Sequence, residues 1–303
     1  MKVLVTGGAG FIGKHLTKFL LDKGHQITIF DDFSNSEKTD MSFLEGMGVK
    51  ILEGDITEID SIVDGLKDYD IVVHLAAKIS VDESIKNPDE TFRVNVDGTK
   101  NLLIACKRNN VKKLIVASSA AVYGEATENV KLTEDSMIDP MSPYGESKVR
   151  MEEEIRKFIL QVKIDCVILR FFNIFGTGQS PEYAGVITKF IKKIKNNEPL
   201  EIFGNGRQTR DFVSVNDVID SIYCAINNGK NGTYNIASGK AITINELATL
   251  MIELSGKNLE IKHTSSKKGE IKFSQADISL AKQEINYFPK SELNEIDKLI
   301  KQD

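Results

Sequence analysis

The chain has 303 residues and a formal net charge of −5, with 27% charged and 41% hydrophobic residues. This composition is typical of globular proteins and excludes the disordered and membrane classes, and the acidic balance gives no basic surface for nucleic acid. The length allows about two domains, or one α/β domain with an appendage. Neither a secretory leader nor a membrane span is indicated, so we expect a cytoplasmic protein.

Cys106, Cys166 and Cys224 are widely spaced and flanked by apolar residues. This usage is typical of reduced core thiols in a cytosolic protein. The four histidines show none of the spacings that metal ligands require. We therefore expect no metal site.

A short apolar strand is predicted at residues 3–5, and it leads into the run Gly7-Gly8-Ala9-Gly10-Phe11-Ile12-Gly13. An amphipathic helix follows this run. Glycines let a backbone approach a pyrophosphate closely, and a helix N-terminus offers amide donors at the positive end of its dipole. A tight turn is the simpler explanation, but the position between first strand and first helix favours a dinucleotide site. The predicted cofactor-binding residues here are Gly7, Gly10, Phe11, Ile12 and Gly13.

Apolar runs alternate with helical patterns through the first half of the chain. Further strands are predicted at 27–30, 50–52, 71–75, 114–117 and 166–172. Such alternation predicts an α/β fold with a doubly wound parallel sheet of the Rossmann type.

Residues that follow these strands predict the rest of the dinucleotide site. Asp31 ends the second strand, where a carboxylate can accept hydrogen bonds from ribose hydroxyls and repels a 2′-phosphate, which favours NAD over NADP. A solvated turn acid is the alternative. Asp55 and Ile56 follow the third strand and are assigned to the adenine rim. Leu75, Ala76 and Ala77 end the fourth with small residues that allow close approach to the cofactor, and the cofactor-binding segment is thus 75–77.

Tyr144 and Lys148 stand four residues apart in a helical pattern, downstream of Ser119. Residues at i and i+4 share one helix face, so the ammonium can favour the ionised phenol. A phenol with a pKa of about 10 is otherwise a poor base at neutral pH. Beside a dinucleotide site, the three residues predict proton transfer coupled to hydride transfer. Taken singly, each has a structural alternative.

From about Gly176 the rhythm changes to longer polar connections, which predicts a smaller cap. A strand at 233–237 is expected to rejoin the main sheet. We expect residues 1–173 to form the NAD-binding Rossmann domain, with a returning segment near 212–240. Residues 174–303 are expected to form mainly a substrate-binding domain.

Several motifs in order resemble the extended short-chain dehydrogenase/reductase family, and within it the NAD-dependent nucleotide-sugar epimerases and dehydratases, most of all the UDP-glucose 4-epimerases. They are Thr6-Gly7-Gly8-Ala9-Gly10-Phe11-Ile12-Gly13, Asn95-Val96-Asp97-Gly98-Thr99, Ser118-Ser119-Ala120-Ala121-Val122-Tyr123-Gly124, Pro143-Tyr144-Gly145-Glu146-Ser147-Lys148, Arg170-Phe171-Phe172-Asn173 and Arg210-Asp211-Phe212-Val213. The resemblance covers nearly the whole chain.

The resemblance implies that Ser119, Tyr144 and Lys148 are catalytic. Tyr144 takes the proton of the sugar 4-hydroxyl while C4 gives a hydride to NAD, Lys148 holds the nicotinamide ribose and lowers the pKa of Tyr144, and Ser119 hydrogen-bonds the reacting oxygen. The 4-keto sugar turns and takes the hydride back on its other face. Tyr144, Lys148 and Asn95 are also cofactor-binding residues by this resemblance.

For a UDP-sugar substrate, the resemblance assigns Asn173 and Arg210 to the diphosphate, with Lys267 in place of the family's usual second arginine. A surface ion pair between Arg210 and Asp211 is the alternative. Ser274, seven residues after Lys267, is placed at the wall that faces the sugar 2-substituent, where a small residue leaves room for an N-acetyl group. A surface serine in a misaligned loop is the other possibility.

Ala120 and Ala121 stand where the related 4,6-dehydratases have Asp-Glu, and alanine cannot transfer protons. A dehydratase is therefore disfavoured. The expected activity is 4-epimerisation of a UDP-hexose. The expected substrates are UDP-glucose and UDP-galactose, with the N-acetylhexosamines as a possible addition. A different nucleotide-sugar epimerase, a UDP-glucuronate decarboxylase and a non-catalytic NAD-sensing protein stay open. A homodimer through helices around 94–106 and 147–158 is what the family suggests.

Overall fold

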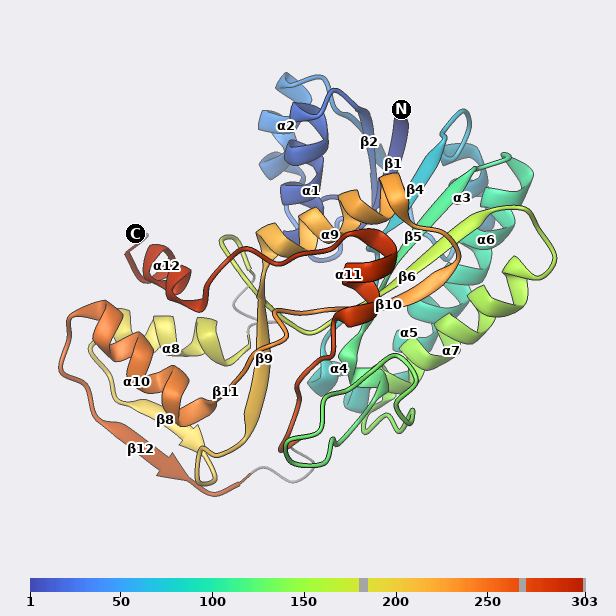
Figure 1. Ribbon diagram of the computed structural model, residues 1–303. Helices are drawn as coiled ribbons and strands as arrows, with labels where there is room; N and C mark the ends of the chain where they lie inside the picture. The colour runs from blue at the N-terminus through green and yellow to red at the C-terminus, as the bar shows by residue number, and fades with distance from the viewer. Residues whose placement is uncertain (180–184, 267–270, 302–303) are drawn as a thin grey trace.

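The main sheet of the protein has seven strands in the order β10-β6-β5-β4-β1-β2-β3, and every pairing in it is parallel (Figure 1). A computed structural model describes residues 1–179, 185–266 and 271–301. The strands are β1 Lys2–Thr6, β2 Gln26–Asp31, β3 Lys50–Glu53, β4 Ile71–His74, β5 Lys113–Ser119, β6 Asp165–Phe171 and β10 Gly232–Ile236. Their ends lie within two residues of the predicted ones. The predicted α/β class with a doubly wound parallel sheet is confirmed.

Helices cover both faces of this sheet, because its strands are apolar on both sides. In β1, Val3 and Val5 pack in one core with helices α1 and α9, whereas Leu4 packs in a second core with α6 and α7. The helices of the main part are α1 Phe11–Asp22, α2 Ser42–Gly46, α3 Ile59–Gly65, α4 Val81–Lys86, α5 Pro88–Phe92, α6 Thr99–Arg108, α7 Pro143–Ile159, α9 Val215–Asn228 and α11 Ser279–Ile285. Short helical turns are η1 Lys38–Met41, η2 Arg93–Gly98 and η3 Ala120–Val122.

A smaller lobe lies beside the main sheet, at the lower left of Figure 1. It has its own core, built around Phe190, Leu247 and Ile296. Its elements are α8 Val186–Lys195, β8 Leu200–Phe203, α10 Ile244–Ser255, β12 Ile261–Thr264, η5 Leu293–Glu295 and α12 Ile296–Lys301. A three-stranded sheet of β11 Ala241–Thr243, β9 Thr209–Ser214 and β7 Asn173–Phe175 adjoins this lobe.

The chain crosses between the two parts more than once. After β9 it forms α9 on the main sheet, and β10 then pairs with β6, as the sequence predicts for its returning strand. The long connection between β5 and α7 also meets the C-terminal segment, through a bridge between Leu132 and Ala276. These crossings bring the second half of the chain to the carboxyl edge of the main sheet, where ligands of open α/β sheets bind.

Two classes of feature are not found in the described part of the chain. No helix there is both long and apolar enough to cross a membrane. Among the same residues, no group of three or more His, Cys, Asp and Glu side chains is arranged to hold a metal ion. Cys106 and Cys166 are free and buried, and Cys224 is free and half-buried.

Candidate active site

The turn between β1 and α1 needs glycine at two positions. Gly7 has a φ of +69°, and a Cβ there would lie 2.5 Å from the backbone nitrogen of Ala76 at the end of β4. A Cβ on Gly13 would lie 2.5 Å from the Cα of Gly8. Gly10 is the N-cap of α1, so the first amides of that helix point out of the turn. The result is a narrow cradle between strand and helix that fits a pyrophosphate, as a dinucleotide cofactor requires.

Asp31 ties this cradle to the end of β2. Its carboxylate accepts hydrogen bonds from the backbone nitrogens of Ala9 and Phe33, each at 2.9 Å. The residue is only 8% exposed, and burial raises the pKa of its carboxyl although both hydrogen bonds oppose the shift. A buried carboxylate at this place disfavours a further negative group such as a 2′-phosphate. The predicted contact with the cofactor ribose is consistent with this placement and stays a prediction.

Asp55 and Ile56 lie at the same sheet edge, after β3. The Asp55 carboxylate accepts a hydrogen bond from the Thr57 backbone at 2.8 Å, and its other oxygen is 3.8 Å from the Arg93 guanidinium. Ile56 is buried against Gly98, where any Cβ would come within 2.7 Å of the isoleucine side chain. The end of β3 is thus a fixed wall next to the end of β2.

The segment 75–77 directly follows β4, and Leu75 and Ala77 line the large cleft described below. Behind it, the buried His74 bridges two threonines: its Nδ1 lies 2.7 Å from the Thr6 hydroxyl and its Nε2 lies 3.0 Å from the Thr99 hydroxyl. Thr99 also donates to the backbone oxygen of Asn95 at 2.7 Å, so its oxygen accepts from His74. Burial, with the Lys148 charge as a smaller cause, lowers the pKa of His74 to about 3.

This histidine makes the fold sensitive to acid. Because the pKa of His74 is about 3 in the folded chain and has its ordinary value of 6.5 in the unfolded chain, its contribution to stability is present above pH 6.5 and is lost as the pH falls toward 3. We expect the free energy of unfolding of the wild type to drop between pH 7 and pH 5 by about 2 kcal/mol more than that of His74→Gln. Urea unfolding at both pH values measures this, with the exposed His263→Gln as control. Equal drops in wild type and His74→Gln would contradict it.

Asn95 lies in η2 and is buried, with its amide engaged inside the protein. Its oxygen accepts from the Lys78 backbone at 2.8 Å, and its nitrogen donates to the Lys78 carbonyl and the Ser147 hydroxyl, each at 2.9 Å. The side chain therefore pins the loop after β4 to helix α7. Its assignment as a cofactor-binding residue stays a prediction.

Helix α7 carries Tyr144 and Lys148, and it begins as its sequence indicates. Ser142 caps the helix by accepting from the Gly145 backbone at 3.1 Å, and Pro143 occupies the first turn. The Tyr144 backbone donates to the Ser84 hydroxyl at 3.1 Å, which fixes the helix start against α4. Ser119 ends β5 in the same region, so strand and helix meet at the carboxyl edge.

Ser119, Tyr144 and Lys148 line one cleft, which has a volume of about 1040 Å³. Lys148 is 3% exposed and donates to the Ala117 carbonyl at 2.9 Å. Burial lowers the pKa of its ammonium to about 8. Burial raises the pKa of the Tyr144 phenol, and a hydrogen bond with the Ser119 side chain opposes this. The expected lowering of the Tyr144 pKa by Lys148 stays a prediction.

The same cleft is lined by Asn173 and Arg210 from the three-stranded sheet. The Asn173 amide donates to the Asp211 carbonyl at 3.3 Å, and the Arg210 guanidinium donates to the Thr209 carbonyl at 2.8 Å. The Asp211 carboxylate is buried and accepts hydrogen bonds from the backbone and the hydroxyl of Ser238. The alternative of a surface ion pair between Asp211 and Arg210 therefore does not apply.

The two remaining predicted substrate residues, Ser274 and Lys267, are not seen to line the cleft. Ser274 is buried at 8% exposure, and its backbone nitrogen donates to the Thr209 hydroxyl at 3.4 Å. It is next to the strand that carries Arg210, but it is not among the described residues that line the cleft. Lys267 lies outside the described residues.

Sequence reasoning missed one wall of the cleft, which is helix α8. Lys189, Lys192 and Lys193 line the cleft from this helix, while Phe190 and Ile194 are buried in the core of the smaller lobe. Lys192 and Lys193 follow Lys189 by three and four residues, which is the signal that could have placed them on one helix face. Lys193 pairs with Glu198 and Glu201, which line the cleft too, so Lys189 and Lys192 are the residues that add positive charge on this side.

Comparisons with known proteins agree with this geometry. Residues 3–237 match the NAD dependent epimerase/dehydratase family. The structure of a UDP-glucose 4-epimerase with UDP-glucose from Thermotoga maritima is similar, at 31% identity and a TM-score of 0.93, and the match covers 99% of this chain and 97% of that one. A UDP-N-acetylglucosamine 4-epimerase from Methanobrevibacter ruminantium in complex with UDP-N-acetylmuramic acid is 36% identical, with a TM-score of 0.90 and coverage of 99% and 95%. A UDP-glucuronate 4-epimerase from Thermodesulfobacterium geofontis is 31% identical, with coverage of 96% and 92%.

Proposed function

This chain belongs to the NAD-dependent epimerase/dehydratase family, and within that family we propose that it catalyses the 4-epimerisation of a UDP-hexose. One observation carries the proposal: Ser119, Tyr144 and Lys148 line a single cleft at the sheet edge where the glycine cradle lies. A proton-transfer group beside a dinucleotide cradle is what a reversible oxidation at a sugar carbon needs.

We assign a separate task to each of the three residues. Bound NAD supplies a reversible hydride acceptor for the sugar C4. The Tyr144 oxygen takes the proton of the 4-hydroxyl and returns it after the sugar has turned over. The Ser119 hydroxyl hydrogen-bonds the reacting oxygen, and the Lys148 ammonium stabilises the ionised phenol. The ammonium is the main form below pH 8 or so, because the pKa of Lys148 is about 8.

For the substrate diphosphate we propose Asn173, Arg210 and Lys267. An arginine fork suits phosphate oxygens, and Lys189 and Lys192 of α8 add positive charge to the same cleft. Residues 174–303 would on this proposal form most of the substrate side, and residues 1–173 the NAD side.

The residues after Ser119 favour epimerisation over dehydration. Ala120 and Ala121 form the short turn η3 directly after β5, next to the reacting position. Elimination of water needs a further acid and base there, and neither alanine can act as one. These alanines do not discriminate between an epimerase and a UDP-glucuronate decarboxylase, which stays the second candidate.

A further proposal about the sugar rests on the family resemblance, which places Ser274 at the sugar 2-substituent although this serine does not itself line the cleft. A serine there would leave space for an acetyl group, so we expect turnover of UDP-N-acetylglucosamine as well as UDP-glucose. Ser274→Tyr is expected to suppress the acetylated substrate selectively by steric exclusion. Relative kcat/KM for the two sugars measures this, and the exposed Ser265→Tyr is the matched control. Equal loss of both activities, or no loss of either, would place Ser274 outside the pocket wall.

Incubation of the purified protein with UDP-glucose, UDP-N-acetylglucosamine and UDP-glucuronate tests the function. The proposed function predicts the 4-epimer of a hexose. Release of CO₂ from UDP-glucuronate would instead identify a decarboxylase. Bound NAD in the protein without turnover of any sugar would favour a non-catalytic NAD-sensing role.

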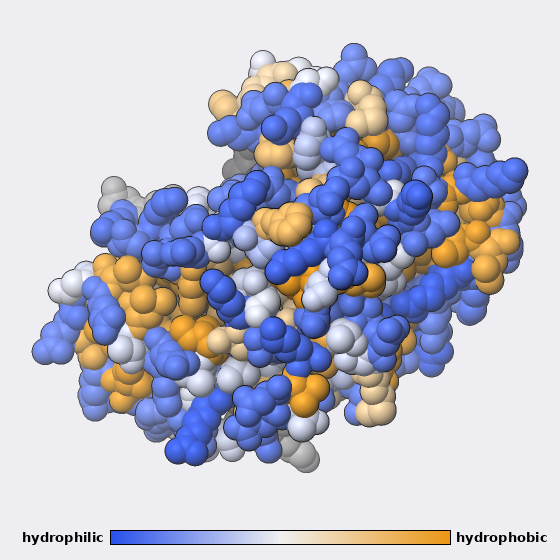
Figure 2. Space-filling view, in the orientation of Figure 1, coloured by the Kyte–Doolittle hydropathy of each residue, from blue (hydrophilic) through white to orange (hydrophobic). Residues whose placement is uncertain are grey.

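We also propose a homodimer through α6 and α7. Figure 2 shows hydrophobic atoms gathered at the edge of the molecule on the side of these helices. Ile104 in α6 is 42% exposed and Leu160, directly after α7, is 86% exposed. Sedimentation of the wild type and of Leu160→Glu tests this proposal, since a charge at the contact would favour the monomer.

A further inference from the structure

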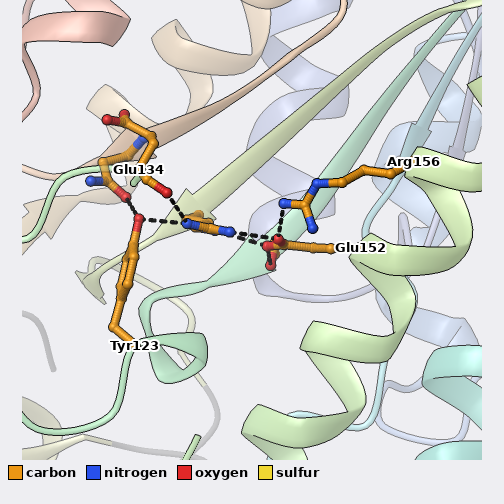
Figure 3. A network of polar contacts seen from close by, with 7 residues as sticks. Tyr123, Glu134, Glu152 and Arg156 are labelled. Atoms are coloured by element: carbon orange, nitrogen blue, oxygen red, sulfur yellow. Dashed lines mark hydrogen bonds and ion pairs between the residues drawn. The ribbon is translucent and has the colours of Figure 1, made fainter. Parts of the chain in front are cut away.

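Behind the catalytic residues lies a buried polar network that the proposed reaction does not use. Its centre is the ion pair of Glu152 and Arg170, in which the guanidinium donates to the two carboxylate oxygens at 2.7 and 3.0 Å. The residues are 1% and 2% exposed. Figure 3 shows Glu152 projecting from α7 beside Arg156, with Tyr123 and Glu134 at the opposite end of the network.

The carboxylate of Glu152 connects the two elements that carry the catalytic residues. Glu152 follows Lys148 by one turn of α7. Its Oε1 also accepts a hydrogen bond from the Ser118 hydroxyl at 2.6 Å, and Ser118 is the residue before Ser119 in β5. One buried carboxylate therefore ties the strand to the helix at the site, next to the bond from Lys148 to the Ala117 carbonyl.

Arg170 extends the network along the sheet toward the neighbouring strand β10, where Asn235 is its register partner. It donates to the Tyr123 hydroxyl at 2.8 Å and to the Glu134 carbonyl at 3.1 Å. Tyr123 in turn donates to the Asn235 side chain in β10 at 2.6 Å. The residues that follow Arg170, including Asn173, line the cleft.

The same ion pair also affects the protonation of Lys148. Burial alone would raise the pKa of Glu152, but the hydrogen bonds and charge of Arg170, helped by the Ser118 hydrogen bond and the charge of Arg156, hold that pKa below its usual value. The ionised carboxylate favours the protonated form of Lys148, against the burial that lowers the lysine pKa. Tyr144 on α7 and the neutral His74 on β4 are further titratable groups near Lys148, and Arg170 from β6 and Arg156 from α7 both pair with Glu152.

Stability alone is a weak reason for this pair. Replacing a buried ion pair by apolar residues of similar volume is often neutral or stabilising, because the two charges must be desolvated. A network with a positioning role should instead affect proton transfer when it is removed in a protein that still folds.

We propose that Glu152 and Arg170 are positioning residues that hold Ser119 and the Lys148 ammonium in the arrangement required for proton transfer at Tyr144. This proposal rests on the proposed function, since it assigns the network to the reaction at that site.

The test removes both charges together in Glu152→Leu/Arg170→Met. We expect a folded protein by circular dichroism whose kcat falls tenfold or more, with KM changed less than about threefold. The alkaline limb of the kcat profile should move to lower pH, because Lys148 loses the attraction of Glu152. Arg150→Met, which removes an exposed ion pair with Glu146 on the same helix, is the matched control and should leave kcat and the profile unchanged.

A second readout does not depend on turnover. The ionisation of Tyr144 is measured by the change of ultraviolet absorbance with pH. The same titration of the Tyr144→Phe form of the wild type and of the double variant is subtracted, which leaves the signal of this one phenol. We expect this phenol to titrate at higher pH in the double variant than in the wild type. If the double variant does not fold, the milder Ser118→Ala, which cuts only the link from Glu152 to β5, should shift the titration in the same direction.

The possible outcomes separate the two proposals. Unchanged kcat, pH profile and Tyr144 titration in the folded variants would overturn the positioning role while leaving the proposed function intact. A wild type that turns over no UDP-sugar would overturn the proposed function, and the Tyr144 titration would then decide alone whether the network acts on the site.

Discussion

Tyr144→Phe is expected to lower kcat by a factor of about 10²–10⁴, because it deletes the group that we propose as general base. Only one hydroxyl is lost, so the fold and the binding of NAD should be retained. Lys148 cannot replace Tyr144 as the general base at neutral pH. Its ammonium donates to the Ala117 carbonyl, and its pKa of about 8 keeps it mainly protonated there. Single-turnover rates with the best UDP-sugar substrate, together with the NAD content of the purified protein, measure both expectations.

The matched control for this variant is Tyr69→Phe. The Tyr69 hydroxyl donates to Thr28 at 2.9 Å in the main sheet, so its loss removes one hydrogen bond without touching the cleft. We expect a stability cost of about 1 kcal/mol and an unchanged kcat. Turnover near the wild-type value in Tyr144→Phe would disprove the mechanism and favour the NAD-sensing alternative.

The sheet could be predicted from the sequence because its strands are short and almost purely apolar. A run such as residues 71–74 is buried on both faces, which only a parallel sheet with helices on both sides provides. The cradle could be predicted for a related reason: a glycine run between a strand and a helix has few other uses at that position. Both signals are local in the chain.

The parts that could not be predicted depend on contacts between distant segments. Arg170 meets Glu152 and Tyr123 across 18 and 47 residues, and no spacing in the sequence indicates such a meeting. Asn95 carries a family motif, yet its amide is used for Lys78 and Ser147, which only the packing of η2 against α7 determines.

The direction of a pKa shift has the same origin. The spacing of Tyr144 and Lys148 predicts attraction between phenolate and ammonium, but it contains no information on burial. In the folded protein burial raises the pKa of Tyr144 and lowers that of Lys148, so desolvation is the largest cause for both groups. A sequence pattern can name the partners of a titratable group, whereas the cleft around them sets how far each is from water.

Gly7→Ala is expected to abolish the binding of NAD and to destabilise the fold by about 2–5 kcal/mol. Two costs combine at this position: a left-handed φ of +69°, and a Cβ that would lie 2.5 Å from the Ala76 backbone nitrogen. The atoms nearest to this Cβ all belong to the backbone of Leu75 and Ala76 and not to a flexible side chain, so β1 and β4 must move apart. The cradle for the pyrophosphate would then lose its shape. Calorimetric titration with NAD and urea unfolding measure the two effects.

Gly24→Ala separates the two costs, because Gly24 has a φ of +77° but no atom within 4 Å of the added Cβ. It should show only the conformational cost, about 1–2 kcal/mol, with NAD binding unchanged. Gly13→Ala and Gly46→Ala form a second pair, without a left-handed φ in either. The Cβ of the first would meet the Gly8 backbone at 2.5 Å, while that of the second meets nothing. If Gly7→Ala and Gly24→Ala bound NAD equally well, the close approach of β1 to the end of β4 would not be what shapes the cofactor site.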